Sequence, residues 1–219
     1  AVAVAMPLIL CASKVNTASS RMAGDRIAEF VPQGYDKALS PSLYLIKELE
    51  TTGTVPSSWK IKPVFSTDSA LNVATIALDG SVSLYGGGEV TGPLLRNGQK
   101  VIFWNTDNPA YGTDNGLRLY QTHPWVMGVR PDGSAFGVIF DSFAKGDLTT
   151  LNDKTVMRSE GAPFRVYVIE RDSPQDMMRA LAQITGTISM PALWTLGYHQ
   201  CRFSYYPEAR VKEIADNFR

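Results

Sequence analysis

The C-terminal part of the sequence constrains the possible folds most strongly. The apolar run at residues 193–203 is typical of a buried β-strand, and Ile214 and Phe218 have the spacing of an amphipathic helix that opens after Pro207. A strand followed by a helix normally leads to a parallel neighbouring strand, because parallel pairing needs a crossover connection. No such strand follows before Arg219, so we expect the chain to be part of a longer protein whose second domain begins here.

Upstream, many short apolar runs separated by polar turns predict a mainly β protein with an antiparallel β-sandwich. These runs lie at residues 43–49, 59–66, 72–78, 81–85, 100–104, 117–129, 134–141, 155–158 and 163–170. Asp79-Gly80 separates two of them and predicts a two-residue hairpin between residues 72–78 and 81–85. The apolar residues within residues 1–40 show no clear periodicity.

A helix is predicted directly after the last of these runs. Ser173 is a capping residue, Pro174 suits the first turn, and Asp176 completes the N-terminal signal. Apolar residues at helical spacing follow, and Gly186 is placed to end the helix. Residues 187–192 then form a linker.

The composition limits the function classes. Lys plus Arg and Asp plus Glu number 21 each, so the net charge is zero and no basic stripe is visible, which argues against a nucleic-acid partner. The two cysteines, Cys11 and Cys201, form neither a disulfide framework nor a metal site. Cys201 is expected to be a plain thiol in the buried strand at residues 193–203.

The first twelve residues, Ala1 to Ala12, are small and apolar. Their length suits the core of a signal peptide but is too short for a membrane span. A truncated secretion signal and a simple hydrophobic strand both remain open, and secretion or a periplasmic location would follow from the first.

Several stretches resemble glycoside hydrolase family 31, and they occur in the order in which that family has them. They are Leu84-Tyr85-Gly86-Gly87-Gly88-Glu89, Trp104-Asn105-Thr106-Asp107, Leu119-Tyr120-Gln121-Thr122-His123-Pro124-Trp125, Phe136-Gly137-Val138 with Asp141-Ser142, and Gly197-Tyr198-His199-Gln200-Cys201-Arg202. The resemblance covers roughly residues 42 to 219. In detail, these stretches are similar to those of the family's α-glucosidase members.

The resemblance implies three parts in the chain. An N-terminal segment would occupy residues 1–40. A galactose-mutarotase-like β-sandwich with its closing helix would occupy residues 41–190. The first β/α unit of a (β/α)8 catalytic barrel would occupy residues 191–219. The enzyme would be a retaining α-glycosidase, most simply an α-glucosidase that hydrolyses terminal α-linked sugars of oligosaccharides. Such enzymes use two carboxyl groups and water, so no metal or organic cofactor is implied.

The catalytic carboxyls are not expected within the chain. In the family both aspartates come from later barrel strands, so they would lie beyond Arg219. No local carboxylate is therefore assigned a catalytic role, and the 219 residues alone are predicted to be inactive.

Asp107 is the first candidate substrate-binding residue. It matches the aspartate of the family's Asn-x-Asp loop, which reaches over the barrel mouth and contacts the sugar. A carboxylate accepts strong hydrogen bonds from sugar hydroxyls. The alternative is that Asp107-Asn108-Pro109 only forms a turn.

Phe203 is the second candidate. It matches the family's aromatic residue at the end of the first barrel strand, which lines the subsite for the sugar at the cleavage point. Phe keeps the apolar ring face of the Trp or Tyr found in α-glucosidase relatives and lacks their polar tip. A plain core aromatic is the alternative reading.

The glycine run Gly86-Gly87-Gly88 invites a phosphate-loop reading, but the Lys-Ser/Thr pair and the helix of such a loop are missing. The glycines are expected to allow a tight strand exit, and Glu89 to be a structural hydrogen-bonding carboxylate.

The expected partners are an oligosaccharide or α-glucoside and the protein's own downstream barrel domain, on which the sandwich would dock. The second hypothesis is a non-catalytic, carbohydrate-binding β-sandwich module, since a fold does not fix a function.

Overall fold

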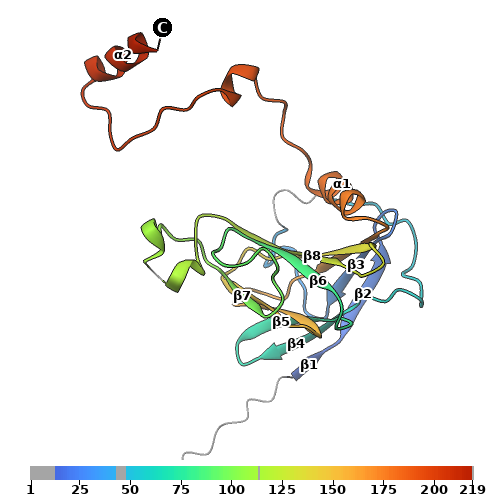
Figure 1. Ribbon diagram of the computed structural model, residues 1–219. Helices are drawn as coiled ribbons and strands as arrows, with labels where there is room; N and C mark the ends of the chain where they lie inside the picture. The colour runs from blue at the N-terminus through green and yellow to red at the C-terminus, as the bar shows by residue number, and fades with distance from the viewer. Residues whose placement is uncertain (1–12, 43–47, 113, 219) are drawn as a thin grey trace, which may run out of the picture. The chain divides into compact units, whose positions relative to one another are not determined.

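The computed structural model describes residues 13–42, 48–112 and 114–218. The chain divides into two compact units, which part after Gly186. The first unit contains all the β-strands and one long helix, and the second contains two helical segments (Figure 1). The Ala1–Ala12 segment and most of the run expected at residues 43–49 lie outside the described residues.

Two six-stranded sheets form the first unit, and every strand pair in them is antiparallel. The first sheet has the order β1 (Ser13–Val15), β4 (Pro63–Asp68), β5 (Leu71–Ala77), β11 (Lys154–Ser159), β10 (Gly146–Thr150) and β7 (Gln99–Phe103). The second sheet has the order β2 (Thr17–Met22), β3 (Ile27–Pro32), β12 (Val166–Arg171), β9 (Ala135–Phe140), β8 (Thr122–Val129) and β6 (Ser83–Gly88). The predicted antiparallel β-sandwich is confirmed.

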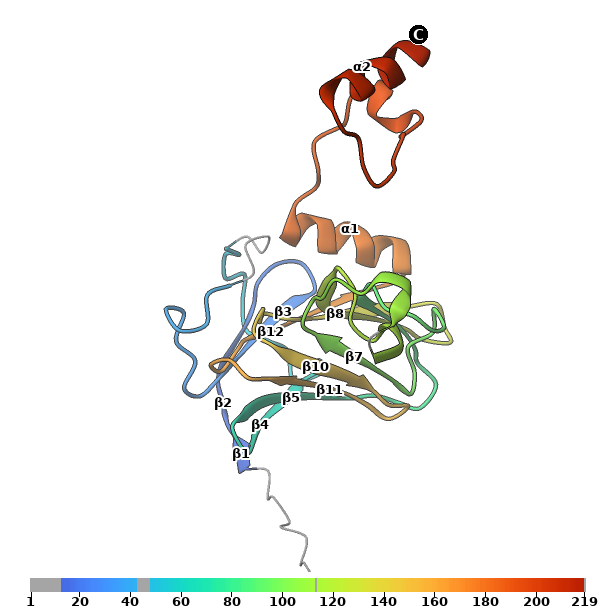
Figure 2. The same ribbon diagram turned by 90° about the vertical axis from the view of Figure 1, so that its left-hand side faces the viewer.

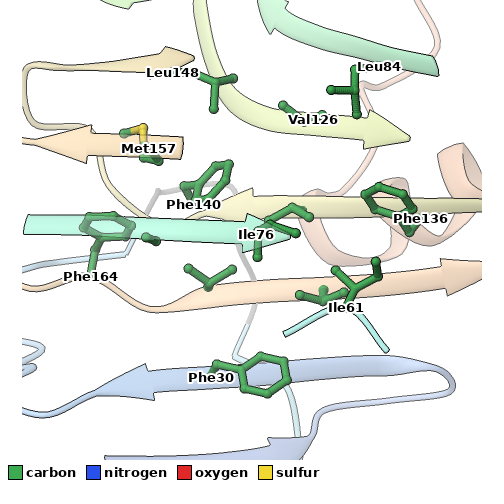
Figure 3. Close-up of a cluster of buried hydrophobic side chains, with 14 of the residues drawn as sticks. Phe30, Ile61, Ile76, Leu84, Val126, Phe136, Phe140, Leu148, Met157 and Phe164 are labelled. Atoms are coloured by element: carbon green, nitrogen blue, oxygen red, sulfur yellow. The ribbon is translucent and has the colours of Figure 1, made fainter. Parts of the chain in front are cut away.

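The main core fills the space between the two sheets. Figure 3 shows some of its side chains, most of which come from strands of the two sheets and point toward one another. The members buried to 2% exposure or less include Ile76, Leu84, Phe136, Phe140, Leu148, Met157 and Phe164. Burial of large apolar side chains of this kind stabilises a fold by about 1.5–3 kcal/mol each.

A second core covers the outer face of the second sheet. Helix α1 (Pro174–Thr185) lies across this face (Figure 2) and packs Met177, Ala180 and Ile184 onto it. Ser173 caps the helix by accepting a hydrogen bond from the Asp176 backbone N–H, and Gly186 ends it with φ 86°, as predicted.

Two predictions about the strands need correction. The hairpin at Asp79-Gly80 is not formed, because β5 pairs with β4 and β11 in one sheet while β6 pairs with β8 in the other. This turn instead carries the chain from sheet to sheet. The sandwich also begins before residue 41, since β1, β2 and β3 pair with strands of both sheets. The short length of β1 and the few apolar residues of β2 conceal these two strands in the sequence.

The second unit contains the 3-10 helix η3 (Leu193–Leu196) and helix α2 (Glu208–Asn217). The helix after Pro207 is as predicted. The strand expected at residues 193–203 is absent, because a strand needs a hydrogen-bonded neighbour and residues 187–218 contain no other strand. Cys201 is consequently exposed rather than buried in a core.

A buried ionic cluster, formed by Glu29, Asp141 and Arg165, lies at the edge of the second core. Arg165 Nε donates to Asp141 Oδ2 at 2.6 Å, and Arg165 Nη1 donates to Glu29 Oε1 at 3.0 Å. Tyr167 Oη also donates to Glu29 Oε1, at 2.9 Å, and burial raises the pKa of this phenol. Ser42 accepts a third bond from Arg165, so the cluster ties residue 42 to the sheet. Arg21 forms a further ion pair with Glu29, so two guanidinium groups balance the two carboxylates, which is the condition for burying these charges.

Replacing Arg165 with Leu is expected to lower the free energy of unfolding by about 3–5 kcal/mol, because Asp141 and Glu29 would remain buried without this partner. Urea denaturation of the 219-residue chain, followed by circular dichroism, measures the change. Arg179→Leu is the matched control: it breaks an exposed pair with Asp176 and should leave the free energy of unfolding nearly unchanged. Equal losses in the two variants would contradict the structural role of the cluster.

Candidate functional site

The chain between β7 and β8 forms a long connection outside the two sheets and carries Asp107. We name residues 104–121 the Asp107 loop; all but residue 113 are described. It contains two short 3-10 helices, η1 (Pro109–Tyr111) and η2 (Asp114–Gly116). Figure 1 shows them in light green at one end of the sandwich. Loops at the end of a rigid sandwich are common positions for binding residues.

Hydrogen bonds within the loop close it on itself. Thr106 N donates to Leu119 O at 3.0 Å, and Asn108 Nδ2 donates to Arg118 O at 3.0 Å. Arg118 in turn forms an ion pair with Asp114 and donates its backbone N–H to the same carboxylate. Asn108 is buried, with 2% exposure. The two arms of the loop are therefore bonded across its base.

A second set of bonds fastens the loop to the residues after β6. Thr91 Oγ1 donates to Asn115 O at 2.5 Å, and Thr91 N donates to Gly116 O at 3.2 Å. Glu89 N donates to Gln121 O at 2.8 Å. These bonds attach both η2 and the C-terminal arm of the loop to the sandwich.

The glycine run at the end of β6 makes this attachment possible. Gly88 has φ 98°, and a Cβ there would lie 2.6 Å from Gln121 O and 2.8 Å from His123 N. Only glycine lets the two backbones approach so closely at a positive φ. Glu89 then accepts a hydrogen bond from Tyr120 N at 3.2 Å, the structural role predicted for it.

Asp107 lies on the exposed side of the loop. Tyr120 Oη donates to Asp107 Oδ1 at 3.0 Å, and the structure gives no hydrogen bond from a described residue to Asp107 Oδ2. An exposed carboxylate with one oxygen held and the other accessible can accept hydrogen bonds from a polyhydroxylated ligand. Tyr120, 51% exposed, was not singled out by the sequence, because thirteen positions separate it from Asp107.

A hollow of about 350 Å³ lies beside the N-terminal arm of the loop. Its walls are Phe103, Trp104, Asn105, Thr122, Pro124, Ser142, Phe143 and Ala144. Trp104, the first residue of the loop, and Phe143, which follows β9, are 53% and 56% exposed, so two large exposed aromatic side chains line this hollow. Aromatic residues in such positions are frequent anchors for ligands and partners.

Phe203 lies in the second unit, between η3 and α2, and its side chain is fully exposed. Arg202 nearby stacks on Tyr205, with its guanidinium carbon 5.0 Å from the ring centroid. Phe203 and Asp107 thus belong to different units, and the role of each remains a prediction.

The described residues contain no group of three or more His, Cys, Asp or Glu that could hold a metal ion. Their helices are also too short or too polar to cross a membrane.

Two family models match the chain, one in each unit. The glycosyl hydrolase 31 N-terminal galactose mutarotase-like domain matches residues 41–148, and the glycosyl hydrolases family 31 TIM-barrel domain matches residues 188–219. Together they cover more than half of the chain. The fold and both matches define a mutarotase-like β-sandwich that precedes a TIM-barrel region.

The chain belongs to glycoside hydrolase family 31 and corresponds to the N-terminal part of its members. "Alpha-glucosidase 2" of Bacillus thermoamyloliquefaciens is 39% identical over 143 residues, which are 64% of this chain and 18% of the relative. The lysosomal alpha-glucosidase of Mus musculus is 29% identical over 168 residues, which are 75% of this chain and 17% of the relative. The matched part therefore spans about a fifth of the length of these relatives.

The chain is also similar to solved structures of the family. A family 31 alpha-glucosidase of Bacteroides thetaiotaomicron has 55% sequence identity and a TM-score of 0.61, over 68% of this chain and 25% of that one. A family 31 dextranase of Flavobacterium johnsoniae has a TM-score of 0.75 over 91% of this chain and 29% of that one. Its 20% identity supports the likeness of fold alone.

Gly88→Ala is expected to destabilise the chain by about 2–5 kcal/mol, the sum of a strained φ and a clash with the backbone of the loop. Gly92→Ala is the matched control, because Gly92 has nearly the same φ, 99°, and no atom within 4 Å of its would-be Cβ. The free energy of unfolding of Gly92→Ala should fall only by the strain of the positive φ, about 1–2 kcal/mol. Chemical denaturation of the two variants measures the difference; identical losses would show that the close approach is unimportant.

Proposed function

We propose that this chain is the N-terminal part of a retaining α-glycosidase, an α-glucosidase that hydrolyses terminal α-linked sugars of oligosaccharides. The observation that carries the proposal is the pair of family 31 matches, sandwich first and barrel second. The α-glucosidase names of the relatives at 39% and 55% identity favour this activity within the family.

The proposed catalytic carboxyls lie outside the 219 residues. In a (β/α)8 barrel the catalytic residues sit at the C-terminal ends of the strands. The family model of the barrel matches residues 188–219, and the described part of this region, residues 188–218, contains η3 and α2 and no strand. One carboxylate would act as nucleophile and the other as acid and then base, with no metal or organic cofactor.

Within this enzyme the sandwich would supply a wall of the sugar site through Asp107. The support is geometric: the loop is bonded across its base and to the residues after β6, while Asp107 itself is exposed. A carboxylate held on a fixed loop loses little conformational entropy when a sugar hydroxyl binds.

The second unit would be completed by the barrel. Its large apolar side chains are exposed, including Ile188, Met190, Leu193, Trp194 and Phe203. So many large apolar side chains exposed within one short segment indicate a packing interface in soluble proteins. We therefore propose that these residues pack within a barrel domain on which the sandwich docks, with Phe203 lining the sugar site.

The test uses the longer enzyme that contains this chain and an aryl α-glucoside as substrate. We expect turnover by the longer enzyme and none by the 219-residue chain. Asp107→Ala should lower kcat/KM about 10- to 100-fold, the usual effect of losing a hydrogen bond to a charged group.

Asp153→Ala serves as the control, because Asp153 lies in the turn between β10 and β11, away from the Asp107 loop in the sandwich. It should leave kcat/KM unchanged. A longer enzyme that cleaves no α-glycoside would overturn the proposed activity, whereas an unchanged kcat/KM in Asp107→Ala would overturn only the role of Asp107.

A further inference from the structure

The hydrogen bond between Tyr120 and Asp107 joins the two arms of the Asp107 loop at its exposed surface. Its length of 3.0 Å and its position on Oδ1 leave Oδ2 without a bond from a described residue. An exposed aspartate without such a bond rotates freely between rotamers. The bond restricts that rotation.

We propose that Tyr120 is a positioning residue that orients the Asp107 carboxylate for the sugar. The inference rests on the proposed function, in which Asp107 contacts substrate, and goes beyond it by assigning a role to a second side chain. Tyr120 holds one carboxylate oxygen, and the other accepts the hydrogen bond of a sugar hydroxyl.

The backbone of Tyr120 is itself fixed from both sides. Its N–H donates to Glu89 Oε2 at 3.2 Å. The residue before it, Leu119, is buried and accepts a hydrogen bond from Thr106 N, and the residue after it, Gln121, accepts one from Glu89 N. The phenol therefore projects from a part of the loop that is bonded to the sandwich.

The chemistry of a phenol suits this role. The hydrogen bond to Asp107 is the main cause that raises the pKa of Tyr120, followed by desolvation, so the phenol stays protonated and donates throughout the neutral range. A neutral donor also leaves the negative charge of Asp107 intact, whereas Lys or Arg would compensate it. A charged acceptor makes the stronger bond to a sugar hydroxyl.

Orientation of this kind lowers the entropy lost on binding, so its removal should affect substrate affinity more than the chemical step. Tyr120→Phe keeps the ring and removes only the donor. We expect it to raise KM about three- to tenfold, the range for one lost hydrogen bond, with kcat changed less than twofold.

The bond itself is tested first, on the 219-residue chain. Nuclear magnetic resonance of ¹³Cζ-labelled tyrosine, with Tyr120 assigned through Tyr120→Phe, follows its titration. Asp107→Ala should lower the pKa of Tyr120 toward the ordinary tyrosine value, because the acceptor is lost. An unchanged titration would mean that the bond is absent in solution and would overturn the proposal.

The functional arm is a double-mutant cycle in the longer enzyme, with Asp107→Ala, Tyr120→Phe and the combined variant. If Tyr120 acts through Asp107, the combined variant should match Asp107→Ala alone within about twofold in KM. Additive losses would overturn the positioning role, as would an unchanged KM in Tyr120→Phe. Melting temperatures of all variants should agree with the wild type.

Tyr111→Phe is the matched control, since it removes another exposed hydroxyl from the same loop; Tyr111 is 56% exposed and its hydroxyl bonds to no described residue. It should leave KM unchanged. If Asp107→Ala itself leaves KM unchanged while the longer enzyme is active, the contact between Asp107 and substrate is refuted, and with it the positioning role of Tyr120. The activity proposed for the enzyme stands in that case.

Discussion

The structure depends on two neighbouring strands that are buried on both faces. In β9 every residue is buried, and β12 is buried at all but one position. Phe136 and Phe140 point into the space between the sheets, while Ile139 and Tyr167 on the other face lie in the core beneath α1. A sheet with two apolar faces needs a cover on both, which the first sheet and α1 supply. The ionic cluster lies at the edge of the core beneath α1, where its opposite charges balance one another.

The candidate site is a consequence of how the ends of this rigid framework are connected. The Asp107 loop leaves the first sheet at β7 and enters the second at β8, so it bridges the two layers at one end. The motif Trp104-Asn105-Thr106-Asp107 pointed to the loop from the sequence. Tyr120 could not be inferred, because it contacts Asp107 only when the two arms of the loop close on each other. Thr91 could not be inferred either, because it reaches the loop only when β6 and β8 pair.

Local signals predicted the fold best where the local chemistry decides the structure. Ser173, Pro174 and Gly186 define α1 through capping and backbone preference. Prediction failed where residues distant in the sequence determine which strands pair. Asp79-Gly80 has hairpin chemistry, yet its flanking strands pair in different sheets, and the run at residues 193–203 has strand composition without a neighbouring strand. Pairing is a property of the whole sheet, which a window of ten residues does not contain.

The order of strands has a consequence for synthesis on the ribosome. In each sheet the strand that comes last in the chain lies inside the sheet: β11 joins β5 to β10, and β12 joins β3 to β9. Until β11 and β12 have left the ribosome, the other strands of the nascent chain can form only four separate ladders. The open edges of these ladders promote aggregation. The sandwich therefore closes late, after most of it has left the exit tunnel. Dependence on chaperones during translation should be concentrated in the interval before residue 171 emerges.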